Sequence, residues 1–128
     1  MSVTSRGWGI SEVDEIPPVK PDWPATWKSV RAHFGITAFG MNAVTKDAGN
    51  VLIPEHHEQE SGQEEVYFVH RGAVQVTIDG EAHEAPEGSV IAVGPNVTRK
   101  LEATASPTTL LVVGATPGRA YEVGEWEL

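Results

Sequence analysis

The chain has 128 residues, the length of one globular domain with a single hydrophobic core. Its formal net charge of −9 would repel phosphate backbones and anionic lipids, so neither a nucleic-acid nor a membrane partner is expected. The absence of cysteine excludes disulfides, thiolate catalysis and thiolate-bound metal. No apolar run has the length of a signal peptide or a membrane span, so a cytoplasmic location is expected.

The segment 1–25 is predicted to be an extended arm. Four prolines forbid regular helix there and disfavour a central strand: Pro17, Pro18, Pro21 and Pro24. Trp8 and Trp23 need an apolar surface, so the arm is expected to pack on the body of the protein or on a partner subunit.

A short helix is predicted to follow the arm at 27–34. Thr26 is a suitable N-terminal cap, and Gly35 is a suitable residue to end the helix. The segment 1–35 is therefore expected to form the arm and helix, and 36–128 a single barrel domain.

After Gly35 the hydrophobic pattern alternates with a period of two, which is typical of β-strands. The content of 13 Gly and 9 Pro suits many short strands joined by tight turns. Asp79-Gly80 predicts a two-residue hairpin, because both residues tolerate left-handed backbone. The segments expected as strands are 36–45, 51–55, 64–71, 73–78, 81–84, 90–93, 97–103, 108–113 and 119–123. The pattern indicates an all-β sandwich or barrel.

A group of imidazoles and carboxylates lies at and between two of these predicted strands. Its members are His56, His57, Glu58 and Glu65. Such nitrogen and oxygen ligands suit a divalent cation. The alternative is an acidic, solvated loop that holds no metal.

The spacing around these residues resembles the cupin superfamily, in particular small single-domain bacterial cupins. The first cupin motif has Gly, five residues, His-x-His, three or four residues, Glu, six residues and Gly. Glu65 and Gly72 match its second half, whereas Glu55 stands five residues after Gly49 where the family has His. The resemblance implies a double-stranded β-helix, or jelly-roll, barrel.

Two registers are open for the missing histidine pair. Either His56 with Glu58 or His57 with Gln59 could take its place. In the first register, the resemblance implies a metal site at His56, Glu58 and Glu65, with an incomplete ligand set.

The second cupin motif, counted from Gly88, places Arg99 where the family has its next His, and Ala103 where it has Asn. A guanidinium cannot ligate a metal, and it would repel a divalent cation nearby. A buried Arg99 would instead need a carboxylate, with Glu65 the first choice and Glu58 the second.

Alternation along the strand 64–71 separates two faces. If Glu65 faces the barrel interior, Tyr67 lines the pocket on the same side. Val66 and Phe68 then form an apolar outer face. Because such a face needs cover, a homodimer is expected.

Three functions remain open on this sequence. The first is a protein that binds a small polar or anionic molecule in a pocket lined by Arg99, Tyr67, Glu65 and His57. The second is a metal-dependent enzyme of the dioxygenase, isomerase or cyclase kind. The third is a structural or regulatory dimer with a packed barrel. Neither catalysis nor a cofactor can be assigned, although a divalent metal fits the candidate ligands.

Overall fold

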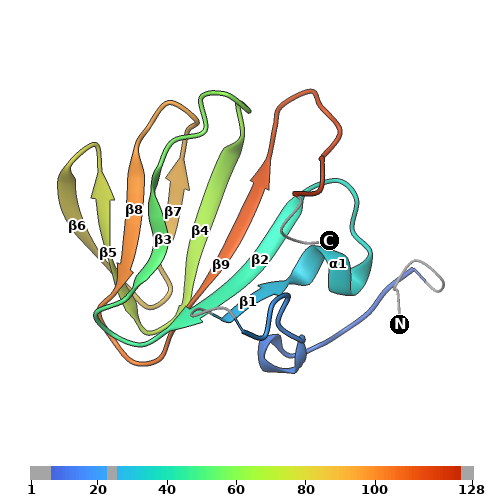
Figure 1. Ribbon diagram of the computed structural model, residues 1–128, viewed down its shortest axis with the longest axis horizontal. Helices are drawn as coiled ribbons and strands as arrows, with labels where there is room; N and C mark the ends of the chain where they lie inside the picture. Colours follow the sequence, from blue (N-terminus) through green and yellow to red (C-terminus); the bar gives the residue numbers. More distant parts are fainter. Residues whose placement is uncertain (1–6, 23–25, 125–128) are drawn as a thin grey trace.

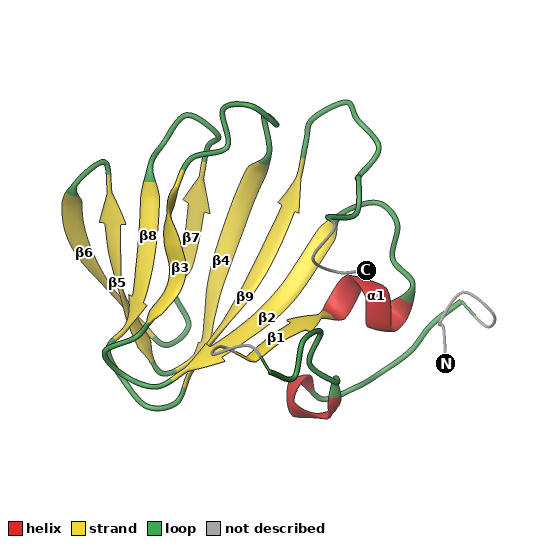
Figure 2. Ribbon diagram, viewed as in Figure 1, coloured by secondary structure: helices red, strands yellow, loops and turns green. Residues whose placement is uncertain are grey.

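The computed structural model describes residues 7–22 and 26–124, which form two antiparallel β-sheets packed face to face (Figure 1). The larger sheet has five strands in the order β1-β2-β9-β4-β7, and the smaller has four in the order β3-β8-β5-β6. The described part of the chain has one short α-helix and a single 3-10 turn beside this all-β body (Figure 2). The predicted all-β jelly-roll barrel, with an arm and one short helix, is confirmed.

Each strand is short, as the turn-rich composition requires. The bounds are β1 Thr26–Ser29, β2 Gly40–Lys46, β3 Val51–His56, β4 Glu64–Arg71, β5 Ala73–Ile78, β6 Glu81–Pro86, β7 Val90–Val93, β8 Arg99–Ala103 and β9 Thr108–Ala115. The predicted hairpin joins β5 to β6, and both Asp79 and Gly80 have positive φ there. None of the described helices is long and apolar enough to cross a membrane.

The helix prediction was wrong at its start. Helix α1 spans Val30–Phe34, and Ser29 caps it through a hydrogen bond of 3.1 Å from the amide of Ala32. The preceding residues instead form β1, which pairs with β2 and adds an edge to the larger sheet. Sheet pairing decides this segment, because an isolated helix of its length is marginal.

Two predicted strands also need correction. The strand expected over 36–45 begins only at Gly40. The segment 119–123 forms no strand and lies outside both sheets. It belongs to the C-terminal stretch 116–124, which runs along the mouth of the barrel cavity described below.

The core lies between the sheets and follows the period of two. Inward side chains of β4 alternate with outward ones, so Tyr67 and Val69 are buried whereas Val66 is 38% exposed. Leu52, Leu101 and Leu110 pack against them from other strands. The core is therefore assembled from both sheets, as expected for a jelly roll.

The arm covers part of the outer face of the larger sheet. A 3-10 turn, η2 (Val13–Glu15), places Ile16 against Val30 and Ala43 in a second apolar cluster. Asp14 at this turn accepts two hydrogen bonds from Arg71, at 3.0 and 3.3 Å. The described part of the arm thus packs on its own chain. Trp23 lies outside the described residues.

Candidate functional site

A cavity of about 600 Å³ opens between β2 of the larger sheet and β3 of the smaller one. Its walls come from β1, β2, β3, β4 and β9, from the β3–β4 loop and from the C-terminal segment. The polar and charged residues that line it are Asn42, Lys46, His56, Glu58, Gln63, Glu65, Tyr67, Tyr121 and Glu122.

Strand register explains how two side chains from outside the larger sheet reach the cavity wall. Gly40, Gly114 and Glu65 are paired in one row across β2, β9 and β4. A side chain at Gly40 would collide with the ring of Tyr121, and one at Gly114 with the amide of Gln63. The two glycines therefore admit groups from outside the sheet next to Glu65.

Strand β3 brings His56 to the same end of the barrel. It pairs with β8 through two irregular steps, so that both Leu52 and Ile53 are buried although they are consecutive. After the second step, His56 lies beside Arg99. These bulges redirect the end of β3 toward the cavity.

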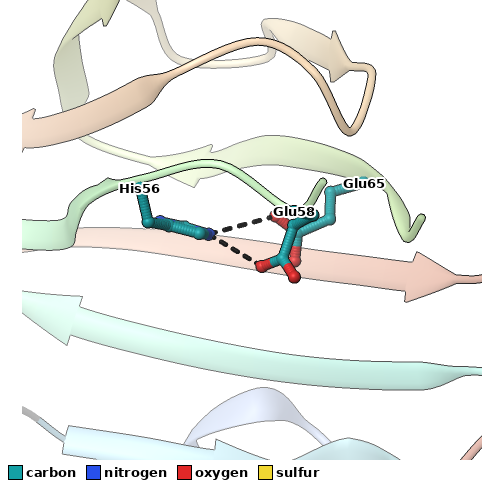
Figure 3. Close-up of side chains that lie close together, drawn as sticks. All are labelled: His56, Glu58 and Glu65. Carbon is teal, nitrogen blue, oxygen red and sulfur yellow. Dashed lines mark ion pairs between the residues drawn. The ribbon is translucent and has the colours of Figure 1, made fainter. Parts of the chain in front are cut away.

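Three ligand atoms converge at this end, as Figure 3 shows. Nε2 of His56 lies 3.0 Å from Oε2 of Glu58 and 3.7 Å from Oε1 of Glu65. One such atom from each residue lies within 4.8 Å of the others. Ligands on one zinc ion, each about 2.0–2.2 Å from it, lie roughly 3 to 4 Å apart. The two distances from His56 fall in this range and the third separation is at most 4.8 Å, so a small shift of the carboxylates would let the set hold a divalent cation.

The tautomer of His56 supports the same fit. Its Nδ1 lies 2.8 Å from the carbonyl oxygen of Pro54, which can only accept, so Nδ1 carries a hydrogen. In the neutral ring, Nε2 then presents a lone pair toward Glu58 and Glu65. Such an arrangement is repulsive unless a proton or a metal cation lies between them. A metal-binding His usually donates a hydrogen bond from its other ring nitrogen, which fixes the orientation of the ring.

Glu65 is held by several donors. Tyr67 donates a hydrogen bond of 2.6 Å to Oε1, and Gln63 donates one of 2.9 Å to Oε2. Burial, followed by the charge of Glu65 and this hydrogen bond, raises the pKa of Tyr67 well above its usual value. The phenol therefore remains a donor at neutral pH.

Arg99 is fully buried beside Glu65 and does not line the cavity. Its Nη1 lies 3.7 Å from Oε1 of Glu65, and Nη2 donates to the carbonyl of Gly94 at 2.8 Å. Nε and Nη1 have no hydrogen-bond partner within the described ranges. The guanidinium faces Glu65, as expected, but it forms no bidentate pair and is not the centre of the cavity.

The remaining two candidates, His57 and Glu58, differ in their position relative to the cavity. His57 is exposed, and its Nδ1 accepts a local hydrogen bond from Gln59, so it is not brought to the cavity. Glu58 is held over the cavity by its loop, in which Ser61 donates to Oε1 at 3.0 Å. The structure therefore brings together His56, Glu58, Glu65 and Tyr67.

Sequence reasoning missed several residues of the cavity wall. Asn42 and Trp27 reach it from β2 and β1, and Gln63 reaches it from the β3–β4 loop. Only alternation along β2 could have indicated Asn42, which lies two residues before the inward-facing Val44. Tyr121 lies in a segment that was expected to be a strand.

A family model described as a cupin domain matches residues 44–114. The chain belongs to the cupin domain family. The match includes His56, Glu58, Glu65 and Arg99 of this cupin, and leaves out Trp27, Asn42 and Tyr121.

Solved structures show the same fold. A cupin protein from Bacteroides fragilis is 19% identical, with a TM-score of 0.67 over 91% of this chain and 90% of that one. A sugar phosphate isomerase of the cupin superfamily from Silicibacter pomeroyi is 24% identical, with a TM-score of 0.66 over 85% and 77%. A predicted oxalate decarboxylase from Thermotoga maritima is 14% identical, with a TM-score of 0.67 over 84% and 99%. No curated protein matches this cupin significantly. These similarities show the fold but do not identify a reaction.

Proposed function

We propose that the protein binds a small polar molecule in the barrel cavity, next to a divalent cation held by His56, Glu58 and Glu65. The bound cation would supply an electrophilic centre for oxygen atoms of the ligand. The chain's own residues hold its ligands in place: Pro54 orients His56, while Tyr67 and Gln63 fix the Glu65 carboxylate.

One observation carries the cation: the lone-pair side of His56 faces two carboxylates. The contacts of 3.0 and 3.7 Å favour an occupant with positive charge. Arg99 approaches the same oxygen of Glu65, Oε1, at 3.7 Å, but among the described residues it forms no ion pair with Glu58, so it does not occupy the position between the three ligands. Its charge would weaken cation binding, because it lies beside a carboxylate oxygen that would hold the cation.

The cavity itself favours ligand binding over a barrel that is merely packed. Its volume of about 600 Å³ lies within the range usual for small-molecule sites. A packed barrel of this size would fill such a space with side chains.

A metal-dependent enzyme is the second candidate. Three protein ligands leave coordination positions that substrate or water can occupy, which is the arrangement of catalytic metal sites. Within the described residues, however, no Ser or Thr hydroxyl lines the cavity as a candidate nucleophile. Any catalysis would therefore depend on the metal, the carboxylates and the other polar groups of the wall, such as Lys46 and Tyr121.

Isothermal titration with Zn²⁺ and Mn²⁺ tests the cation site. We expect one ion per chain, and a loss of affinity of at least about tenfold in His56→Ala and Glu65→Gln, because each removes one of three ligands. His57→Ala is the matched control, since His57 is exposed and does not line the cavity. Unchanged binding in His56→Ala, or equal losses in both histidine variants, would reject the site.

A further inference from the structure

Asn42, on the cavity wall, has a buried polar atom without a hydrogen-bond partner among the described residues. This atom is Oδ1, and the side chain is 8% exposed. A buried acceptor without a partner is costly, and proteins tolerate it mainly where a ligand or water completes it. Asn42 also lines the cavity, so a small turn of its side chain would present this acceptor to a ligand there.

The register places Asn42 opposite the cation site. Asn42, Val112 and Tyr67 form one inward row across β2, β9 and β4. Neighbouring strands are about 4.8 Å apart, so Asn42 lies roughly 10 Å from Tyr67 across the sheet. Glu65 lies two residues before Tyr67 on the same face of β4. A single small molecule can therefore reach from Asn42 to the His56–Glu58–Glu65 cluster.

The charges along the wall favour an uncharged ligand. A divalent cation would balance Glu58 and Glu65, and Lys46 balances Glu122 among the charged residues on the wall. Arg99, the group expected to attract an anion, is fully buried beside Glu65 and does not line the cavity. A carboxylate or phosphate would therefore find no uncompensated positive charge there.

The remaining groups on this wall suit a polyol. An amide both donates and accepts hydrogen bonds, as a hydroxyl group does. Trp27 lies on β1 next to β2, diagonal to Asn42, and its side chain also lines the cavity. An indole ring provides an apolar surface for the C–H groups of a sugar. A volume of about 600 Å³ holds roughly 20 waters, which leaves room for a six-carbon sugar.

We infer that the cavity takes an uncharged polyhydroxyl compound of monosaccharide size, and that Asn42 determines this specificity by hydrogen-bonding a ligand hydroxyl. This inference rests on the proposed function, because it places the other end of the ligand at the cation. Asn42 lies outside the segment that matches the family model. The residue thus adds a specificity that the matched segment does not contain.

The test is ligand-observed NMR titration of the Zn²⁺-loaded protein with compounds matched in shape and different in charge. D-glucose, D-xylose and myo-inositol are the neutral probes, D-glucuronate is the anion and D-glucosamine the cation. We expect at least one neutral probe to bind about tenfold more tightly than either charged compound. Failure of all three neutral probes to bind, or preference for a charged one, would overturn the inference.

Asn42→Leu keeps the approximate shape of the side chain and removes its polar atoms. We expect this variant to lose about tenfold or more in affinity for the neutral probe while its melting temperature is equal or higher, because an unpartnered buried acceptor is gone. A structural role for Asn42 would instead lower the melting temperature and leave the neutral probe bound.

Zn²⁺ titration of the same samples separates the two proposals. Intact Zn²⁺ binding without binding of any neutral probe would reject the polyol inference alone. Absent Zn²⁺ binding with Asn42-dependent probe binding would reject the cation site alone. Asn50→Leu is the matched control, because Asn50 is exposed and outside the cavity. An equal loss of probe binding in that variant would also count against Asn42.

Discussion

Arg99 and Glu65 face each other in the barrel interior, with Nη1 of the one 3.7 Å from Oε1 of the other. Arg99 is fully buried and Glu65 is 9% exposed, so both charges are largely removed from water. The contact is longer than a hydrogen bond, and two nitrogens of the guanidinium lack partners among the described residues. The pair is therefore only partly satisfied, which has consequences for stability and for metal binding.

Replacing Arg99 with Met should lower the free energy of unfolding by about 1–3 kcal/mol, less than the usual loss for a broken buried pair. The loss is smaller because Tyr67 and Gln63 still donate to Glu65. Urea unfolding of the variant provides the measurement. The double variant with Glu65→Gln should recover most of the loss, and a double variant as unstable as Arg99→Met would contradict an interaction between the two charges.

Tyr67→Phe should lower the free energy of unfolding by about 1–3 kcal/mol, because Oε1 of Glu65 loses its shortest hydrogen bond. The pKa of Tyr67 is raised in the folded protein, so the phenol does not ionise near neutral pH. The difference between the two proteins should stay constant from about pH 6 to 9. It should shrink above the usual Tyr pKa of about 10, where the unfolded chain ionises first. A difference that changes between pH 6 and 9 would contradict this.

Arg99→His should raise the affinity for Zn²⁺ by at least about tenfold, because it removes a fixed positive charge and offers a fourth ligand beside His56. Arg99→Met is the matched control, since it removes the charge and adds no imidazole. We expect its gain to be smaller in the same isothermal titration. Affinity of Arg99→His at or below that of the unmodified protein would show that Arg99 lies outside the reach of the cation.

Asp14→Asn should loosen the arm from the sheet, because Arg71 donates two hydrogen bonds to this carboxylate. The same contact lowers the pKa of Asp14, so the carboxylate stays charged to pH values below its usual titration range and the contact is lost only in stronger acid. Hydrogen exchange of the backbone around η2, corrected for intrinsic rates, should be unchanged between pH 7 and 5 in the unmodified protein. Exchange should be faster in the variant at both values.

Glu12→Gln is the control for the arm. The pKa of Glu12 is raised, chiefly by its hydrogen bond and repulsion with Glu15, so this substitution removes no attraction to the sheet. Backbone hydrogen exchange around η2 should remain as slow in Glu12→Gln as in the unmodified protein. Equally fast exchange in both variants would show that Arg71 does not anchor the arm through Asp14.

The outer face of β4 and β7 should form a homodimer interface. Val66 is 38% exposed and Val90 is 66% exposed, and Phe68 pairs with Val90 between the two strands. Sedimentation velocity at micromolar concentration should give a dimer, and Val90→Asp should give a monomer, because a charge in an apolar interface is strongly unfavourable. Ala82→Asp adds the same charge to the exposed strand β6 and should remain dimeric. A monomer in the unmodified protein would contradict the interface.

Local patterns were sufficient to predict much of the barrel. Alternation along β4 predicted that Glu65 and Tyr67 share the inner face, and the Asp79-Gly80 pair predicted its hairpin. The start of the helix could not be predicted in this way, because Thr26 and Ser29 are both good caps. The choice between them depends on the pairing of β1 with β2, which is a long-range contact.

Local sequence patterns predicted less of the candidate site than of the barrel. The nearness of Arg99 to Glu65 could be expected from motif spacing, but its absence from the cavity wall depends on which edge of the barrel is open. The choice between His56 and His57 depends on how β3 bends before the loop. Asn42 carries no motif, and its importance appears only when the row from β2 to β4 is assembled.

Because β3 pairs irregularly with β8, the number of residues in β3 matters as much as their identity. Val51 pairs with Glu102 and His56 with Arg99, so five steps along β3 match three along β8. Removing one residue between Val51 and His56 would reverse the alternation beyond that point and turn the imidazole to the opposite face. Deletions in this strand are therefore constrained as strictly as substitutions of the ligands. A homologue with a one-residue gap there would keep the barrel and lose the cluster, even with every side chain of the cluster conserved.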